Sequence, residues 1–273
     1  RKSFVFLENL KKTDMKQLFF YISFITFFNC QLVFAQDYIK GNGNVVKKNR
    51  SISEFDVIEA KGMVNVFLEQ GNSNSILVEA DENLHDHIIT KVSGKTLTIK
   101  NDINIRDAVK VDIYVTFNEI EALDGSGATD IEALTSLKTS DDFYLKASGA
   151  VDMNIKKGLQ CKTLSIEASG SSDIYLDNAS PTSIKANVSG STDLEMSGNA
   201  EDFTLTAGGS SDVEAKDFSV KNATISATGS SDIYTHVTDK IMVSASGSSD
   251  VYYTGNPSVE QINASRAADV LKQ

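Results

Sequence analysis

The stretch Ser169-Gly170-Ser171-Ser172-Asp173-Ile174 is one of five nearly identical copies of a short motif in this 273-residue chain. The other close copies are SGSTDL at 189–194, GGSSDV at 208–213, TGSSDI at 228–233 and SGSSDV at 246–251, and looser ones are GATDI at 127–131 and GAVDM at 149–153. The motif glycines stand at positions 127, 149, 170, 190, 209, 229 and 247. A nearly constant period of about twenty residues is typical of a fold built from stacked repeats.

Side chains alternate in character through each copy. Around Asp173, the positions of one parity are Leu164, Ile166, Ala168, Gly170, Ser172, Ile174 and Leu176, and those of the other parity are mostly polar. This alternation predicts a β-strand with one buried face. Each repeat therefore reads as a strand, a tight corner of small residues and a second strand, with the first parity facing inward.

One such unit cannot bury its apolar face alone, whereas stacked units can. A propeller blade needs about 40 residues, and an up-and-down meander does not favour seven copies of one turn. We therefore predict an all-β fold, a single-stranded parallel β-helix with coils of about 20 residues. Coils of this varying length favour the right-handed form.

The ends of the repeat region are atypical, as is usual for terminal repeats. Residues 264–270 form an eighth copy with Arg266 in the glycine position, and residues 61–66 form a degenerate first copy with Asn65 in the aspartate position. We expect wider β coils over 36–124, continuous with the regular Gly-Ser-Ser-Asp repeats and a C-terminal cap over 125–273.

The first 35 residues have a different composition. Met15-Lys16 precedes an apolar run over 18–28, and Val33-Phe34-Ala35 provides the small residues of a cleavage site. This pattern predicts a signal peptide over 15–35, with 1–14 as an over-extended N-terminus. Alternatives are an uncleaved anchor and a lipid-modified Cys30. The signal peptide implies export, to the periplasm or the cell surface, and no membrane span after cleavage.

Charge and cysteine content limit the partners and the chemistry. The net charge of -11 argues against nucleic acid and anionic membranes as partners, because both need basic patches. Beyond the signal peptide only Cys161 remains, so that no disulfide can hold the fold together. His85 and His87 are two residues apart and form a candidate metal pair, but two solvated histidines on a charged loop are the favoured interpretation.

The outward positions of a β-helix form columns along the stack, and these are the candidate binding residues. One column is Asp152, Asp173, Asp193, Asp212, Asp232 and Asp250, and a neighbouring one contains Tyr175, Tyr234 and Tyr252. Stacked carboxylates repel each other by about 1 kcal/mol per pair in water. Aspartates that cap turn N–H groups would explain the motif locally. Alternatives are Ca²⁺ bound between coils by Asp and Ser oxygens, and a surface that binds glycans or cell-surface proteins.

Catalysis has little support in the sequence. The aspartates are spread one per coil rather than gathered in a groove, and there is no nucleophile elbow, P-loop or dinucleotide-binding motif. The sequence therefore predicts no enzyme activity and no cofactor, apart from the Ca²⁺ alternative. A polysaccharide lyase or hydrolase on a β-helix remains the alternative class, because paired carboxylates are abundant.

The chain also resembles a family of secreted bacterial proteins, the putative auto-transporter adhesins with a head GIN domain. The resemblance rests on GNGN at 41–44, FDVIEAKG at 55–62, VNVFLEQG at 64–71, VEADENL at 78–84 and the Ser-Gly-Ser-Ser-Asp repeats. It covers about residues 40–270 and implies an exported, non-enzymatic β-helix of the bacterial envelope. The leading hypothesis is an adhesin-like or scaffold role through the Ser/Thr/Asp/Tyr columns.

Overall fold

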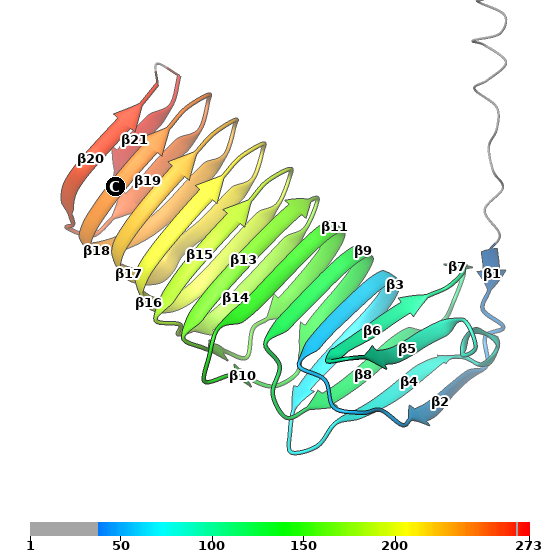
Figure 1. The fold of residues 1–273 in the computed structure, drawn as a ribbon. Helices are drawn as coiled ribbons and strands as arrows, with labels where there is room; N and C mark the ends of the chain where they lie inside the picture. The colour runs from blue at the N-terminus through cyan, green and yellow to red at the C-terminus, as the bar shows by residue number, and fades with distance from the viewer. Residues whose placement is uncertain (1–37, 266) are drawn as a thin grey trace, which may run out of the picture. The chain divides into compact units, whose positions relative to one another are not determined.

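The structure is a computed structural model that describes residues 38–265 and 267–273, and almost all of its regular elements are β-strands. The strands form about eight turns, each lying on the one before it (Figure 1). The predicted all-β parallel β-helix is therefore confirmed, while the handedness stays a prediction. The expected signal peptide, Cys30 and the 1–14 extension lie outside the described residues.

The regular part of the stack is built from parallel strands that pair motif to motif. Its strands are β9 (Ala122–Ala133), β10 (Leu137–Lys138), β11 (Phe143–Ile155), β12 (Leu159–Gln160), β13 (Thr163–Gly170), β14 (Asp173–Ala179), β15 (Ser183–Val188), β16 (Asp193–Ala207), β17 (Asp212–Ala227), β18 (Asp232–Ala245), β19 (Asp250–Thr254), β20 (Ser258–Ala264) and β21 (Asp269–Lys272). In β14 and β16, for example, Asp173 pairs with Asp193 and Ile174 with Leu194. Equivalent side chains consequently stack about 4.8 Å apart along the solenoid.

The inner face of each coil is filled by the aliphatic positions that the alternation predicts. Leu164, Ile166 and Ala168 are buried in β13, and the same positions are buried in the neighbouring strands. Gly170 was expected to face inward with them but is exposed. The reason is that its neighbour in the stack is the glycine of the preceding coil and not the core.

Glycine stacks on glycine at the motif corners from Gly127 to Gly247. The motif glycines have positive φ, between 80° and 105°, a region that side chains with a Cβ rarely adopt. A Cβ on Gly209 would lie 2.5 Å from the carbonyl oxygen of Gly190 in the coil before it. That same oxygen accepts a hydrogen bond of 2.7 Å from the Ser210 N–H. The column continues down to Gly62, which confirms the degenerate first copy.

In the close copies of the motif, the Ser or Thr before the aspartate closes the corner from inside. Ser172, Thr192 and Ser211 have no solvent exposure, although they are polar. Each hydroxyl donates a hydrogen bond of 3.0–3.1 Å to the carbonyl oxygen three residues earlier. The buried hydroxyl is therefore satisfied locally. The sequence predicts aspartates that accept turn N–H groups. Asp212 and Asp250 do accept a backbone N–H, but from the next coil, whereas within the corner itself the buried hydroxyl bonds a carbonyl oxygen.

The N-terminal part differs from the expected wider coils, because several of its strands are antiparallel. Its elements are β1 (Tyr38–Lys40), β2 (Val45–Arg50), β3 (Val57–Gln70), β4 (Ser75–Asp81), the 3₁₀ turn η2 (Glu82–Leu84), β5 (Ile88–Ser93), β6 (Thr96–Asn101), β7 (Asn104–Arg106) and β8 (Val111–Phe117). β2 pairs antiparallel with β4, β4 with β8, and β5 with β6. The β5–β6 hairpin turns through Gly94 at φ 62°, which suits a two-residue hairpin turn.

The N-terminal strands extend the two long sides of the stack without a break. β3 runs around the first corner, so that its first half pairs with β6 and its second half with β8. From Val57 to Leu68 it pairs in parallel with β9, which crosses the expected boundary at 124/125. The strands that follow the corner therefore form one continuous side, β2–β4–β8–β3–β9 and onward, called here the post-corner sheet (Figure 1).

The C-terminal end is an eighth coil, as the sequence predicts. Asp269 pairs with Asp250 and Val270 with Val251. All residues of β20 are exposed, because no further described coil covers them. In the described part of the chain, no helix has the length and apolar character needed to cross a bilayer.

The glycine column generates a stability prediction. We expect Gly209→Ala to lower the free energy of unfolding by about 3 kcal/mol, because the methyl group adds a collision with the Gly190 backbone to the strain of a positive φ. Urea denaturation followed by circular dichroism measures this loss.

Gly94→Ala is the matched control. Gly94 also has positive φ, but nothing lies within 4 Å of the Cβ position. It should cost only the backbone strain, about 1–2 kcal/mol. Equal losses in the two variants would show that stacking contact does not set the requirement for glycine.

Cys161 is a buried residue in the short connection between β12 and β13. Burial, together with the nearby Asp142 charge, raises the pKa of its thiol to about 11. We expect maleimide at neutral pH to leave Cys161 unmodified in the folded protein and to label it after unfolding, because the thiolate is the reactive form. Peptide mapping by mass spectrometry resolves this site from Cys30. Native labelling at full stoichiometry would contradict the buried position.

Candidate functional site: an acidic row across the stack

The predicted aspartate column is present as one straight row on the post-corner sheet. Register pairs link Asp130 through Asp152, Asp173 and Asp193 to Asp212, and Asp232 through Asp250 to Asp269. The two halves join where Val213 pairs with Ile233 and the Asp232 N–H donates to Asp212 Oδ1. We call this row the aspartate ladder: Asp130, Asp152, Asp173, Asp193, Asp212, Asp232, Asp250 and Asp269. It contains the six predicted residues and extends by one at each end.

The row continues beyond the repeats into the N-terminal strands. Asn65 pairs with Asp130 on one side and with Asp112 on the other. Asp112 pairs with Glu79, and Glu79 with Lys47. Sequence reasoning missed Glu79 and Asp112, because their strands join the row through antiparallel pairing that no repeat encodes. The asparagine in the degenerate first copy was the one local sign that the row reaches this far.

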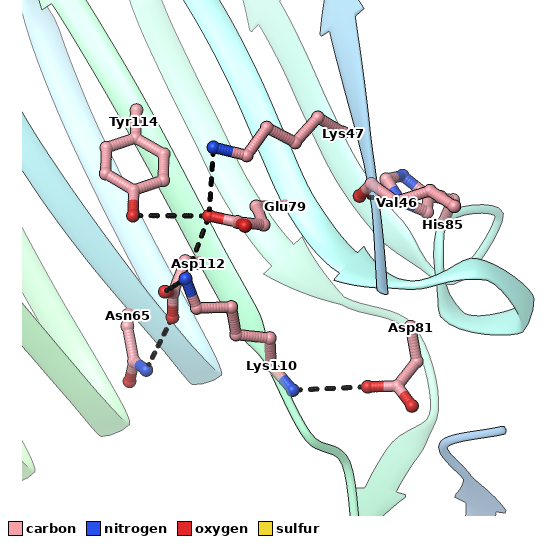
Figure 2. Close-up of polar contacts among 9 residues, drawn as sticks. All are labelled: Val46, Lys47, Asn65, Glu79, Asp81, His85, Lys110, Asp112 and Tyr114. Atoms are coloured by element: carbon pink, nitrogen blue, oxygen red, sulfur yellow. Dashed lines mark hydrogen bonds and ion pairs between the residues drawn. The ribbon is translucent and has the colours of Figure 1, made fainter. Parts of the chain in front are cut away.

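Two lysines neutralise this N-terminal end of the row (Figure 2). The Lys110 Nζ lies 2.9 Å from Glu79 Oε2 and 3.2 Å from Asp112 Oδ2, and the Lys47 Nζ lies 3.6 Å from Glu79 Oε2. Asn65 Nδ2 donates to the other Asp112 oxygen at 3.0 Å. The hydrogen bond from Lys110 is the largest influence on Glu79 and lowers the pKa of that carboxyl. This end therefore forms a closed ion-pair network.

A buried carboxylate holds Lys110 in place. Asp81 is fully buried and accepts hydrogen bonds from the N–H groups of Gly43 at 2.6 Å, Val109 at 2.9 Å and Lys110 at 3.2 Å. Burial by itself would raise the pKa of Asp81, but these donors outweigh it and the pKa is lowered. Asp81 thus fixes the start of β8, from which the Lys110 side chain reaches the row (Figure 2).

The ladder itself has no such neutralisation. Among the described residues, no Lys, Arg or His forms an ion pair with a ladder aspartate. Burial, and then the charges of the adjacent aspartates, raise the pKa of Asp130, Asp173 and Asp232. Asp212 and Asp250 each accept a backbone N–H from the next coil, at 3.3 and 3.1 Å. The ladder is therefore a line of repelling charges held by the backbone register.

The tyrosines lie in the neighbouring row, two residues further along each strand. Tyr234 and Tyr252 stack with ring centroids 4.8 Å apart, and the Lys216 Nζ lies 3.7 Å from the Tyr234 centroid. Tyr175 is separated from them by Glu195 and Glu214 and has Lys156 over its ring at 4.4 Å. Because Tyr234 lies between Lys216 and Tyr252, it presents its edge and hydroxyl rather than an open ring face.

The two histidines that the sequence singled out do not come together. Buried His85 places Nε2 3.1 Å from the Val46 carbonyl oxygen, whereas His87 Nδ1 lies 3.0 Å from Asp102 Oδ1. Within the described ranges, no group of three His, Cys, Asp or Glu side chains has the geometry to hold a metal ion. The histidine pair therefore has no arrangement that supports a metal centre.

Fold and site together define a class of protein, a β-solenoid that presents one long, regular, polar side. Residues 54–257 match the family described as "Putative auto-transporter adhesin, head GIN domain", and the chain belongs to this family. The family resemblance of the sequence is thereby confirmed. A search of curated proteins finds no match.

Solved structures share the fold at low sequence identity. A structure described as a putative adhesin from Parabacteroides merdae has a TM-score of 0.78 at 21% identity, over 87% of this chain and 99% of that one. Two structures from Parabacteroides distasonis each match 86% of this chain and 100% of their own. One is described as a putative adhesin, with a TM-score of 0.79 at 21% identity, and the other as a putative lipid binding protein, with 0.77 at 22%.

The unneutralised ladder predicts that removing one charge stabilises the fold. Asp173→Asn relieves repulsion from Asp152 and Asp193, each worth about 1 kcal/mol in water and less in salt. We expect the melting temperature at pH 7 to rise by about 2–4 °C. Calcium is the control: if the ion binds between coils, it raises the melting temperature of the original protein above that in a chelator and removes the advantage of Asp173→Asn.

The same charges predict an unusual pH dependence. A carboxyl whose pKa is raised by folding binds protons more tightly in the folded state, so that its unfavourable contribution grows as pH rises through the folded pKa. Stability should therefore increase on acidification from pH 7 until about pH 4, near the unfolded pKa of aspartate. Below that value Glu79 and Asp81, whose pKa values are lowered, lose their stabilising charge. A smaller gain on acidification in Asp173→Asn, measured by thermal melts across pH, tests the assignment.

Proposed function

We propose that this protein is an exported, non-catalytic binding protein of the bacterial envelope, with the aspartate ladder and its flanking polar columns as the adhesive surface. Its family is described as a putative auto-transporter adhesin and two structural relatives as putative adhesins, which supports a binding role. The signal-peptide pattern at 15–35 supports export. The partners in view are glycans or cell-surface proteins.

The observation that carries the proposal is the contrast between the two ends of the acidic row. At Glu79 and Asp112 the protein pairs its own carboxylates with lysines. Along the repeats it leaves eight in a row without a cationic partner in the described chain, at a cost in stability. Charge retained against stability is expected where a surface is used for recognition. The regular spacing of about 4.8 Å gives a repeating set of acceptors for hydroxyl, amide or ammonium groups.

The arrangement supports binding better than hydrolysis or lyase chemistry. A glycosidase needs two carboxylates that flank one bond with different pKa values and a groove to hold the sugar. The ladder places like residues in like surroundings, one per coil. Neither the cavity beside Glu54, Asn72 and Asn118 nor the interior space beside Phe117, Phe143 and Leu159 is lined by ladder residues.

A lipid-binding role is the second candidate, suggested by the name of one structural relative. The solenoid interior does not favour it. The interior space lined by Phe117, Phe143 and Leu159 has no room for a water molecule. A lipid would therefore need to lie on the outside of this part of the stack, where the ladder is acidic.

The test compares two triple variants that remove the same charge. Asp173→Asn/Asp193→Asn/Asp212→Asn changes the ladder, while Glu167→Gln/Asp202→Asn/Asp239→Asn changes exposed acids elsewhere. Binding is measured on a glycan array and on surfaces coated with mucin or fibronectin. We expect the ladder variant to lose about tenfold or more in affinity, and the control variant to bind like the original protein.

Two results would contradict the proposal. One is equal binding by both triple variants. The other is saturable cleavage of a polysaccharide that the ladder variant abolishes, which would favour the carbohydrate-active alternative. Thermal melts of both variants show that any loss of binding is not a loss of fold.

A further inference from the structure

A polar cavity lies at the N-terminal part of the molecule, away from the ladder. It has a volume of about 410 Å³, within the range of about 300–1,000 Å³ of small-molecule sites. Three connections line it: 51–56 between β2 and β3, 71–74 between β3 and β4, and 118–121 between β8 and β9. The repeat pattern does not encode it, because it forms where the antiparallel strands join the stack.

The walls of the cavity are fixed by hydrogen bonds, so that its shape is set before any ligand arrives. The Asp56 N–H donates to the Lys95 carbonyl oxygen at 2.8 Å, and the Glu121 N–H to the Asp56 carbonyl oxygen at 2.7 Å. The Asn118 N–H donates to Asn74 Oδ1 at 3.3 Å, which ties the second connection to the third. Phe55 is buried beneath the site and anchors the first connection in the core.

Two of the three lining carboxylates already have partners in the protein. Asp56 forms an ion pair of 3.0 Å with Lys95. Glu119 Oε1 accepts hydrogen bonds from the Thr139 hydroxyl at 2.9 Å and the Ser140 N–H at 3.3 Å. Glu54 is therefore the single lining carboxylate that remains open to a ligand.

The groups left to a ligand are mostly neutral. Within the described chain, Asn118 makes hydrogen bonds only through its backbone, and the side chains of Asn72, Ser73 and Glu54 have no hydrogen-bond partner. The two amides each offer donors and acceptors, the serine hydroxyl offers both, and Glu54 offers acceptors. Vicinal hydroxyl groups of a sugar match this mixture, because each hydroxyl donates to one group and accepts from another.

Other ligand classes fit less well. No Lys or Arg lines the cavity, which disfavours phosphate and other anions. With one unpaired carboxylate, the cavity gives a cation little charge to bind. The apolar lining is limited to Ile52 and Phe55, so an apolar ligand would find little surface to bury.

We propose that this cavity binds a neutral sugar unit through Asn72, Ser73, Asn118 and Glu54. The site is separate from the ladder and gives the protein a second, concave recognition element of defined size. The cavity would bind one terminal sugar unit, whereas the ladder would contact a partner over an extended surface.

The test is a titration by saturation-transfer NMR of the full chain. The probes are D-glucose, D-galactose, D-mannose and N-acetylglucosamine, with spermidine and inorganic phosphate as the charged comparators. We expect saturable binding of at least one sugar, with a dissociation constant on the order of 1 mM. Asn72→Ala/Asn118→Ala should weaken it by about tenfold or more, and the exposed Asn187→Ala on β15 should leave it unchanged.

The pocket variant should keep its fold, because neither amide side chain is bonded within the described protein, and its melting temperature checks this. The ladder triple variant should bind the sugar normally, so that failure here and failure of the proposed function are distinguishable. The proposal is overturned if no sugar gives saturable binding, if only spermidine or phosphate binds, or if Asn72→Ala/Asn118→Ala binds like the original chain.

Discussion

The contact of glycine on glycine at the tight corner is the constraint on which the rest of the stack depends. Each motif glycine needs positive φ for the chain to turn, and its missing side chain is what allows the previous coil to come within hydrogen-bonding distance. A Cβ on Gly209 would collide with the carbonyl oxygen of Gly190, and this oxygen accepts the hydrogen bond from the Ser210 N–H. The same glycine therefore allows both the turn of the chain and the close stacking of successive coils. A side chain at one corner would disturb two coils.

Register follows from this constraint, and the ladder follows from register. Once the glycines are aligned, the residue three positions later must align as well, and in this chain it is an aspartate. The backbone thereby holds carboxylates of like charge side by side, and burial together with the neighbouring charges raises the pKa of Asp130, Asp173 and Asp232. The energy for this comes from the aliphatic core, whose residues are almost fully buried along the whole stack.

The N-terminal strands solve a different problem, which is how to end a parallel stack. β4 pairs antiparallel with β8, and β2 pairs antiparallel with β4, so that both extend the post-corner sheet. The β5–β6 hairpin extends the other side. An open row of parallel backbone groups would invite pairing with other chains. The change of strand direction also brings together segments distant in sequence. Asp81 links three of them, and the cavity beside Asn72 and Asn118 forms between three others.

The sequence by itself determined the repeat, the inner columns and the ladder from Asp152 to Asp250. It could do so because each of these is a local pattern copied at a nearly fixed period. When the coils stack, residues one period apart in the sequence become neighbours in space. It also contained the signal for the β5–β6 hairpin, in Gly94 between two alternating strands, which the expectation of wider coils overlooked.

Only the tertiary structure decided that the acidic row continues through Asp112 to Glu79 and ends on Lys110 and Lys47. It also decided that Tyr234 has both ring faces covered, and that the buried serine or threonine bonds a carbonyl oxygen of its own corner while Asp212 and Asp250 accept N–H groups of the next coil. These features depend on which strands pair, on antiparallel register and on side-chain packing. Pairing between strands distant in sequence leaves no repeated pattern in the sequence. A side-chain hydrogen bond depends on the positions of both partners in space, which the sequence alone does not give.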